Sequence, residues 1–326
     1  MSIGDDESFP ARIHPVKLFD VAKSEGRPLY VSAPMVRYSK LPFRLLVQSY
    51  GCDLTYTPMM LAQEYTRSAP ARSSDFSTSR HEGPLIAQFA ATNATDFVRA
   101  STLISPWVNG VDLNCGCPQS WAIKEGIGCA LLAPRNRELV ASIVRAARLA
   151  LGGGKSVSVK IRVSKDLRET VQLLRAVEQA GADYVTVHAR TREQRSSTPP
   201  IYAALPTVMA ATSLPVVFNG DVDSVATAAE VHAKYGVQGV MSARPLQENP
   251  ALFAGFESTP RECVERFVRF AVRDGLRFEL VVRHLVDMMG GLASKKERAQ
   301  IMGCTDLIEL IDWLEEKGFI GPSRDA

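Results

Sequence analysis

The sequence predicts an α/β fold, a (β/α)8 or TIM barrel followed by a small C-terminal helical domain. Three observations predict it. Short apolar, β-branched segments recur eight times, helix-periodic segments lie between most of them, and the strand pattern stops after about residue 250. Strands that are apolar on both faces belong to parallel sheets covered by helices, and eight βα units close into a barrel.

The predicted strands end at polar, Gly or Pro residues and are spaced as βα units are. They cover, in order, residues 30–36, 53–60, 84–91, 110–116, 156–162, 183–190, 215–221 and 239–244. Residues 138–151 and 167–181 have helical periodicity, and the second segment ends at Gly181, which suits a helix C-cap. An open doubly wound sheet is the alternative, but no GxGxxG motif opens a helix after the first strand.

The pattern after Pro250 is helical, from Glu262 to Gly318. We therefore predict a barrel domain over residues 1–254 and a helical domain over residues 255–326. The basic residues of this second part fit either an ordinary solvated helix face or a polyanion-binding face. They are Arg261, Arg266, Arg269, Arg273, Arg277, Arg283, Lys295, Lys296 and Arg298.

The composition excludes several classes of protein. The N-terminus is acidic and contains Pro, and no stretch has about 18 uninterrupted apolar residues, so we expect neither a secretory signal nor a membrane span. We expect a cytoplasmic protein, with the nucleus as the alternative.

Six cysteines, two of them only two positions apart, do not form a disulfide framework, so reduced thiols are expected. The net charge of +3 is compatible with a polyanionic partner but does not demonstrate one.

The active site of a TIM barrel is built from the carboxyl ends of its strands. The residues at these ends are Pro34, Met35, Gln88, Asn114, Cys117, Lys160, His188, Asn219, Asp221 and Arg244. Each alone has an ordinary explanation, such as a helix cap or a hydrogen-bonded core histidine. Together they are hard to explain as packing, because burying unpaired polar groups costs several kcal/mol. They indicate a flat, hydrogen-bonding redox cofactor with a phosphate tail.

A flavin fits this set. Gln88 can bond the carbonyl and imide edge of the ring, and Lys160 can stabilise the negative charge of the reduced ring, while His188 either adds to that or faces the tail. Residues 219–221 and 242–250 follow the seventh and eighth strands, the usual phosphate site of this fold, where Arg244 can receive a dianion.

Cys117 is the candidate proton donor. A thiol with a pKa of about 8.5 is mostly protonated near pH 7 and can protonate a carbanion-like carbon. Hydride from a flavin and a proton from Cys117 would together reduce a polarised C=C bond. The alternatives are a buried structural cysteine and a metal site shared with Cys115, but no second Cys or His pair stands at zinc spacing, so we predict no metal. The long, Gly-punctuated segment 119–134 is typical of a substrate-covering loop.

These segments, taken together, resemble the flavin-dependent tRNA-dihydrouridine synthases. The matching pieces are APM (33–35), QFAA with Gln88, DLNCGCP with Cys117, VKIR with Lys160, VHARTR with His188, NGD and MSAR. They occur in family order from about Tyr30 to Phe256, followed by a helical tail like the family's RNA-binding domain. The strings APMVRYSKLPFR, CDLTYTPMM, CGCPQSW and NPALFAG are most similar to the subfamily that acts at positions 20a and 20b of the tRNA D-loop.

The resemblance implies an FMN cofactor, NADPH as its reductant and tRNA as the partner. It implies that Cys117 donates a proton to C5 of uracil while hydride passes from flavin N5 to C6. The uridine must leave its stack to reach the ring; Asn114 would hold the base or order the cysteine loop, and Arg190 and Arg192 would meet its phosphates. The implied FMN-binding positions are Pro34, Met35, Val36, Gln88, Lys160, His188, Asn219, Gly220, Asp221, Ala243 and Arg244.

The chain departs from the family pattern in three places. Pro245 stands where Gly usually follows Arg244, which removes an amide donor, and Ala243 and Ala189 replace frequent glycines. Two other functions fit the residues. A flavin barrel acting on a free small molecule would not need the basic tail, and for a catalytically silent tRNA-binding protein Cys117→Ala would have no consequence. We expect a monomer.

Overall fold

The computed structural model describes residues 13–321, and its centre is a parallel β-barrel. The strands are β1 (Leu29–Ser32), β2 (Thr55–Tyr56), β4 (Leu85–Ala90), β5 (Gly110–Cys115), β6 (Ser156–Arg162), β7 (Tyr184–His188), β8 (Val216–Asn219) and β9 (Gly239–Ser242). They pair in the order β1-β9-β8-β7-β6-β5-β4-β2, and a parallel bridge between Val31 and Leu54 joins the two ends of the sheet. The short β3 (Met60–Leu61) pairs with β4. The predicted barrel is confirmed, and each predicted strand overlaps an observed one.

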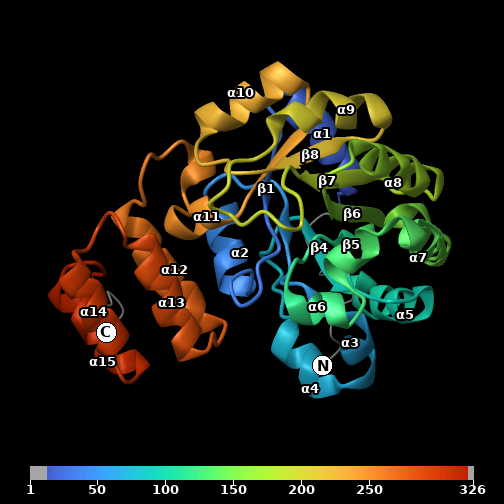
Figure 1. The fold of residues 1–326 in the computed structure, drawn as a ribbon. Helices are drawn as coiled ribbons and strands as arrows, with labels where there is room; N and C mark the ends of the chain where they lie inside the picture. Colours follow the sequence, from blue (N-terminus) through green and yellow to red (C-terminus); the bar gives the residue numbers. More distant parts are fainter. Residues whose placement is uncertain (1–12, 322–326) are drawn as a thin grey trace.

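Helices follow the strands and cover the outside of the barrel (Figure 1). They are α2 (Leu41–Gln48), α3 (Ala62–Arg67), α4 (Ala69–Asp75), α5 (Ala94–Ile104), α7 (Arg137–Leu151), α8 (Leu167–Gln179), α9 (Leu205–Ala211) and α10 (Val225–Tyr235). Asn93, Asp166 and Ser224 cap α5, α8 and α10 by accepting hydrogen bonds from first-turn amides, which is why these helices begin there. Gly181, just beyond α8, has the positive φ expected for a C-cap glycine.

The barrel interior is apolar at one end and polar at the other. At the apolar end, α1 (Pro15–Ser24) places Phe19 against Tyr184, with 5.5 Å between the ring centroids. The hydroxyls of Tyr184 and Tyr56 hydrogen-bond to each other at 2.6 Å across the interior. Because successive side chains of a strand alternate between its faces, the same inward row of β7 that carries Tyr184 carries His188 at the carboxyl end.

Two short helices lie at the carboxyl ends of the strands, α6 (Ser120–Lys124) after β5 and α11 (Arg244–Glu248) after β9. The segment 119–134, predicted as a loop, therefore contains α6 and a 3-10 turn over Gly128–Leu132.

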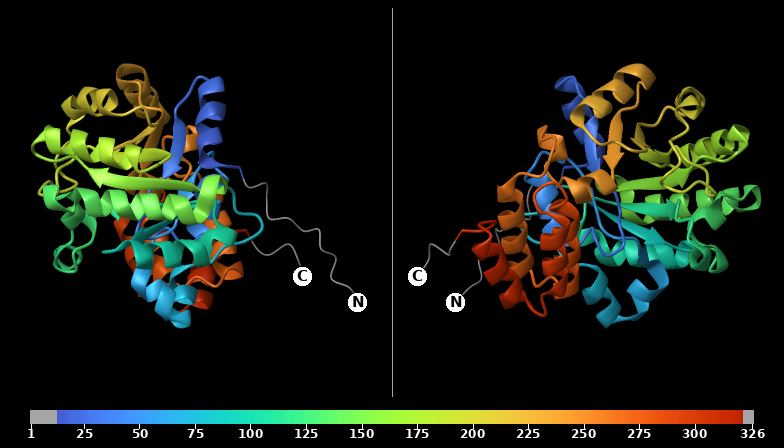
Figure 2. Two further views of the ribbon diagram at one scale, coloured as in Figure 1. Left: turned by 90° about the vertical axis from the view of Figure 1, so that its right-hand side faces the viewer. Right: turned by 60° about the vertical axis from the view of Figure 1, so that its left-hand side comes forward.

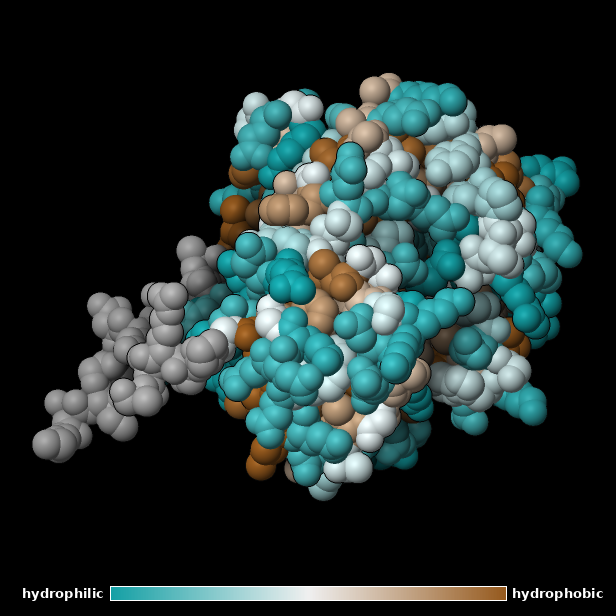
Figure 3. Space-filling model, turned by 90° about the vertical axis from the view of Figure 1, so that its left-hand side faces the viewer, coloured by the Kyte–Doolittle hydropathy of each residue, from teal (hydrophilic) through white to brown (hydrophobic). Residues whose placement is uncertain are grey.

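Four further helices form a second hydrophobic cluster beside the barrel: α12 (Arg261–Arg273), α13 (Phe278–Met288), α14 (Lys295–Gly303) and α15 (Leu307–Glu316). Figure 2 shows them as a group next to the barrel. Leu46 and Tyr50, at the end of α2, belong to this second cluster, so α2 joins it to the barrel. The surface seen from the side of these helices is mostly hydrophilic (Figure 3). No helix within residues 13–321 is long and apolar enough to span a membrane.

Two buried polar residues, Arg44 and His284, lie on α2 and α13. Arg44 of α2 pairs with Glu82 and also donates to the carbonyls of Ser39 and Ser77, both at 2.7 Å. His284 of α13 lies among the rings of Tyr38, Phe43 and Phe267, and neither of its nitrogens has a hydrogen-bond partner in the described chain. Burial lowers its pKa to about 3, with a smaller opposing effect from the Tyr38 backbone.

Candidate active site

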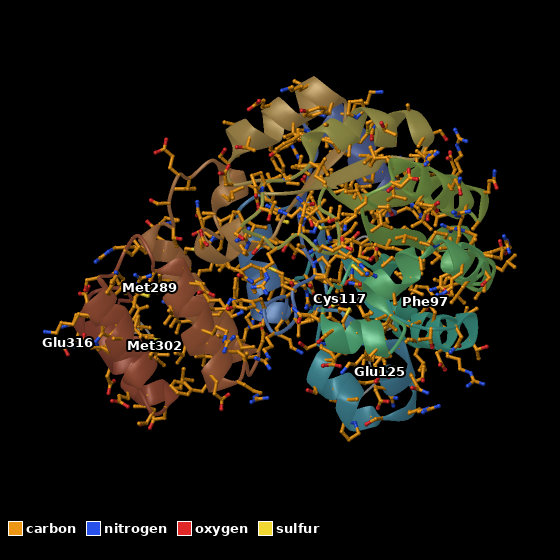
Figure 4. All side chains as sticks on the ribbon, in the orientation of Figure 1. Phe97, Cys117, Glu125, Met289, Met302 and Glu316 are labelled. Atoms are coloured by element: carbon orange, nitrogen blue, oxygen red, sulfur yellow. The ribbon has the colours of Figure 1, made fainter. Side chains whose placement is uncertain are left out.

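Cys117 follows β5 and is half-buried, whereas the other five cysteines are buried. Figure 4 shows it near the middle of the molecule, beside α6 and apart from Met289 and Met302 in the C-terminal helices. The side-chain oxygen of Asn114 accepts hydrogen bonds from the amides of Gly116 and Cys117, at 3.1 and 3.0 Å. Arg162 donates to the Gly116 carbonyl at 2.9 Å. The thiol therefore stands on a loop that is fixed from two sides.

A third contact to this loop comes from Gly128 and Cys129. The amide of Cys129 donates to the Cys117 carbonyl at 2.9 Å. Gly128 has a φ of +61°, and a Cβ atom built on it would lie 2.6 Å from the Cys117 carbonyl oxygen and 2.8 Å from its Cβ. Only glycine fits so close an approach.

Polar side chains of β4, β5 and β6 form a connected series next to this loop. Gln88 is fully buried, donates to Asp112 at 2.8 Å and accepts from Asn114 at 2.7 Å. Ser158 donates to the other oxygen of Asp112, at 2.7 Å. Burial raises the pKa of Asp112 to about 6, although these hydrogen bonds and the charge of Lys160 oppose the shift.

Lys160 of β6, the register neighbour of Asn114, meets Asn219 at the carboxyl end of β8. The ammonium of Lys160 donates to the Asn219 side-chain oxygen at 2.9 Å, and the Asn219 amide donates to the Met241 carbonyl at 2.9 Å. Burial, together with nearby Arg162, lowers the pKa of Lys160 to about 8. The lysine is thus a buried cation with one hydrogen-bonding acceptor in the described part of the chain.

His188 is a neutral imidazole. Burial and the surrounding cations lower its pKa to about 2. Its Nε2 lies 3.2 Å from Nη1 of Arg190, which can only donate, so Nε2 accepts and the ring proton resides on Nδ1.

Arg190, expected to meet a tRNA phosphate, is enclosed by protein partners in the structure. This side chain is only 2% exposed, and it donates to the carbonyls of Ser196 and Thr198 and pairs with Asp221. In this position the guanidinium holds the loop after β7, and its contact with an RNA phosphate stays a prediction. Arg192 is exposed and pairs with neighbouring Glu193, and its phosphate contact stays a prediction.

Asp221 also pairs with Arg244, at 3.1 Å, and has a φ of +52°, an uncommon conformation for a residue other than glycine. Neighbouring Gly220 is tightly enclosed, because a Cβ atom on it would lie 2.9 Å from the Phe218 ring and 3.0 Å from Pro200. The segment after β8 is therefore held in one shape, and it presents Arg244, which remains about half exposed.

The remaining predicted positions follow β1 and β9. Ser39 anchors the loop after β1, because its hydroxyl accepts from the Met35 amide at 3.0 Å and donates to the Ala33 carbonyl. Gln247 of α11 donates to the Met35 sulfur at 3.0 Å, which links the β1 and β9 ends. Pro34 is half-buried, Val36 is exposed, and Ala243 is the residue before α11. Pro245 lies in the first turn of α11, where an amide has no partner within the helix.

Sequence reasoning missed two residues. Asp112 and Arg162 were not expected to take part in the site, yet they contact Gln88 and the cysteine loop respectively. The alternation of side chains along a strand could have identified both residues. Asp112 precedes Asn114 by two positions and Arg162 follows Lys160 by two, so each lies on the same face of its strand as a predicted site residue.

The basic residues of the C-terminal helices do not form one free surface. Those of α12 have local partners: Arg261 lies over Phe319, Arg266 over Tyr50, and Arg269 pairs with Glu265. Arg277, which pairs with Glu279 at 3.5 Å, and Arg283 line a groove that reaches the barrel rim. Its other lining residues are Val36, Arg37, Lys40, Pro58, Met59, Ser74, Asp75, Glu279 and Leu280. Within residues 13–321, no three His, Cys, Asp or Glu side chains are grouped so that they could hold a metal ion.

Comparison with known proteins gives a family match and close relatives. The family described as Dihydrouridine synthase (Dus) matches residues 31–308. A Schizosaccharomyces pombe protein, tRNA-dihydrouridine(20a/20b) synthase (NAD(P)+), is 46% identical over 93% of this chain and 91% of its own length. The Homo sapiens protein of the same name, with the suffix -like, is 41% identical over 93% of each chain.

Among solved structures, histamine dehydrogenase from Rhizobium sp. 4-9 is similar in fold, with a TM-score of 0.55 and 11% identity. The match covers 74% of this chain and 49% of that one. At this identity the similarity shows the fold alone.

Proposed function

From the premise that this chain belongs to the dihydrouridine synthase family, we propose that it reduces uridine to dihydrouridine in the D-loop of tRNA. The observation that carries the proposal is identity of 40% or more to relatives named for positions 20a and 20b, over nearly the whole chain. We assign the same two positions to this enzyme, with NAD(P)H as the reductant and NADPH as its preferred form.

The strand-end residues fit a flavin. Gln88 has one amide N–H and one oxygen lone pair left after its bonds to Asp112 and Asn114, which suits a ring edge that alternates carbonyl and imide groups. Lys160 supplies a buried positive charge with N–H donors to spare, which suits the negative charge of a reduced ring. When bound, the flavin supplies hydride to C6 of the uracil.

We propose FMN as the flavin, with its phosphate beside Arg244. The guanidinium of Arg244 is half exposed and is held by Asp221 and by the Ser196 carbonyl, at 3.1 and 3.2 Å. Asp221 acts by orienting Arg244 and Arg190 rather than by meeting the phosphate, because two like charges in contact would repel. The enclosed Gly220 keeps the chain close beneath them.

Cys117 donates the proton. Its Sγ–H bond breaks as a C–H bond forms at C5, so that the C5=C6 double bond gains a proton at C5 and a hydride at C6, and the thiolate recovers its proton from solvent. Asn114, Arg162 and Cys129 hold the loop that carries the thiol. Because the other cysteines are buried, Cys117 is the thiol that a base entering the barrel mouth can reach.

The groove lined by Arg37, Lys40, Arg277 and Arg283 supports a role for the helical part, residues 255–326, in binding tRNA. It runs from the barrel rim to α13, and cations there would contact the RNA backbone while the target uridine is extruded, at a cost of a few kcal/mol. A monomeric, cytoplasmic enzyme remains our expectation.

The test is to incubate purified protein with unmodified tRNA and NADPH, to measure dihydrouridine in the digested RNA, and to identify the released flavin by mass. We expect dihydrouridine and FMN. Reduction of small enones with no product on tRNA would favour a small-molecule oxidoreductase, and tRNA binding without flavin or product would favour a catalytically silent binding protein.

A further inference from the structure

Asp112 is a buried carboxylate to which the proposed reaction gives no task. It is fully buried within the barrel, and each of its oxygens accepts one hydrogen bond, from Ser158 and from Gln88. No ion pair to it is present among the described residues. Burying an ionised carboxyl without an ion-pair partner costs several kcal/mol of folding free energy, so its presence here needs a reason.

The acceptor character of Asp112 sets the direction of the hydrogen bonds that follow it. An ionised carboxylate only accepts, so the Gln88 amide must turn its nitrogen to Asp112 and its oxygen to Asn114. The Asn114 nitrogen then faces Gln88, which leaves its oxygen for the amides of Gly116 and Cys117. With either amide reversed, donors would face donors at 2.7 to 3.1 Å.

We propose that Asp112 is a positioning residue: by accepting from Gln88 it fixes which amide group of Gln88 faces a ligand, and through Asn114 it orders the backbone that carries Cys117. The inference rests on the proposed function, since it assigns the same carboxylate an effect on both the flavin site and the proton donor. We therefore expect FMN affinity and the accessibility of the Cys117 thiol to change together when the acceptor at position 112 is lost.

The experiment compares four variants, Asp112→Ser, Asp112→Asn, Thr186→Val and Gln88→Leu, in flavin-free protein and after FMN addition. Asp112→Ser is too short to reach Gln88. Asp112→Asn keeps an acceptor oxygen for Gln88 and can turn its nitrogen to Ser158, whose hydroxyl can accept. Thr186→Val is the control, because this hydroxyl is buried in the same barrel without a partner in the described chain. The readouts are the rate of Cys117 alkylation by iodoacetamide, followed by intact mass, and the Kd for FMN.

For Asp112→Ser we expect alkylation about threefold faster or more, because the half-buried thiol becomes more accessible, and a Kd for FMN raised about tenfold or more. Asp112→Asn should stay within about threefold of the wild type in both, and Thr186→Val should match it. Gln88→Leu breaks the series one step later and should accelerate alkylation as Asp112→Ser does, so it decides the matter if Asp112→Ser does not fold.

Wild-type alkylation and FMN affinity in Asp112→Ser, with only thermal stability reduced, would overturn the proposal, as would equal damage in Asp112→Asn or a wild-type alkylation rate in Gln88→Leu. Failure of the proposed function has a different signature: the wild-type protein would bind no FMN and reduce no tRNA, whatever residue 112 does to the thiol.

Discussion

Gly128 touches the backbone of Cys117 so closely that any side chain on it would overlap the reactive loop, with 2.8 Å between the two Cβ positions. This contact joins the segment after α6 to the end of β5. The position of the thiol therefore depends on a residue that carries no chemistry of its own.

Gly128→Ala is expected to displace the cysteine loop and to lower the rate of dihydrouridine formation about tenfold or more, since small misplacements of a reacting group are costly. FMN binding should change little. Gly126→Ala is the matched control: it has a similar φ of +73°, but its Cβ would meet only a Thr92 methyl at 3.7 Å. Single-turnover rates of both variants test the prediction. An equal loss of rate in the two variants would show that backbone strain, not the contact with Cys117, matters.

Lys160→Met should make the bound flavin harder to reduce. Loss of the buried cation removes an interaction that favours the negatively charged reduced ring, so the midpoint potential should fall by about 30 mV or more, roughly 1.4 kcal/mol for two electrons. Lys160→Arg keeps the positive charge, so the midpoint potential should fall less in this variant. A potential that is unchanged in Lys160→Met would place the lysine away from the ring.

The buried ion pair between Arg44, on α2, and Glu82 should contribute more to the free energy of unfolding than an exposed pair does. Glu82→Leu leaves the guanidinium unpaired, at an expected cost of about 3 to 5 kcal/mol in the free energy of unfolding. The exposed pair between Arg269 and Glu265 is the control, since Glu265→Gln should cost less than about 1 kcal/mol. Urea denaturation measures both, and comparable small effects would contradict the distinction.

His284 should make the protein less stable in acid. The unfolded imidazole has a pKa of about 6.5 and the folded one about 3, so between these values the unfolded state binds more protons. The free energy of unfolding therefore falls as the pH falls through this window, by roughly 1.4 kcal/mol per pH unit from this group. His284→Leu lacks this contribution and should gain on the wild type as the pH is lowered from 7 to 5. Parallel stability curves would refute it.

The barrel and most strand-end residues could be predicted because they follow from local pattern: apolar runs mark strands, and the first polar residue after each run lies at the shared rim. The burial of Arg190 could not be predicted in this way, because it depends on how the loop carrying Ser196 and Thr198 folds back over the side chain. The pairing of Asp112 with Gln88 requires the register between β4 and β5. Which basic residues share a face with the barrel rim likewise depends on how α12 and α13 pack.

Position-resolved mapping of dihydrouridine in unmodified tRNA, treated with wild-type protein or with Cys117→Ala, each with FMN and NADPH, is the decisive experiment. We predict product at positions 20a and 20b with the wild type, and its loss in the variant although the flavin still binds and is reduced. Product at the same positions and rate in Cys117→Ala would contradict the assignment of Cys117 as the proton donor, and product confined to other positions would contradict the assigned substrate.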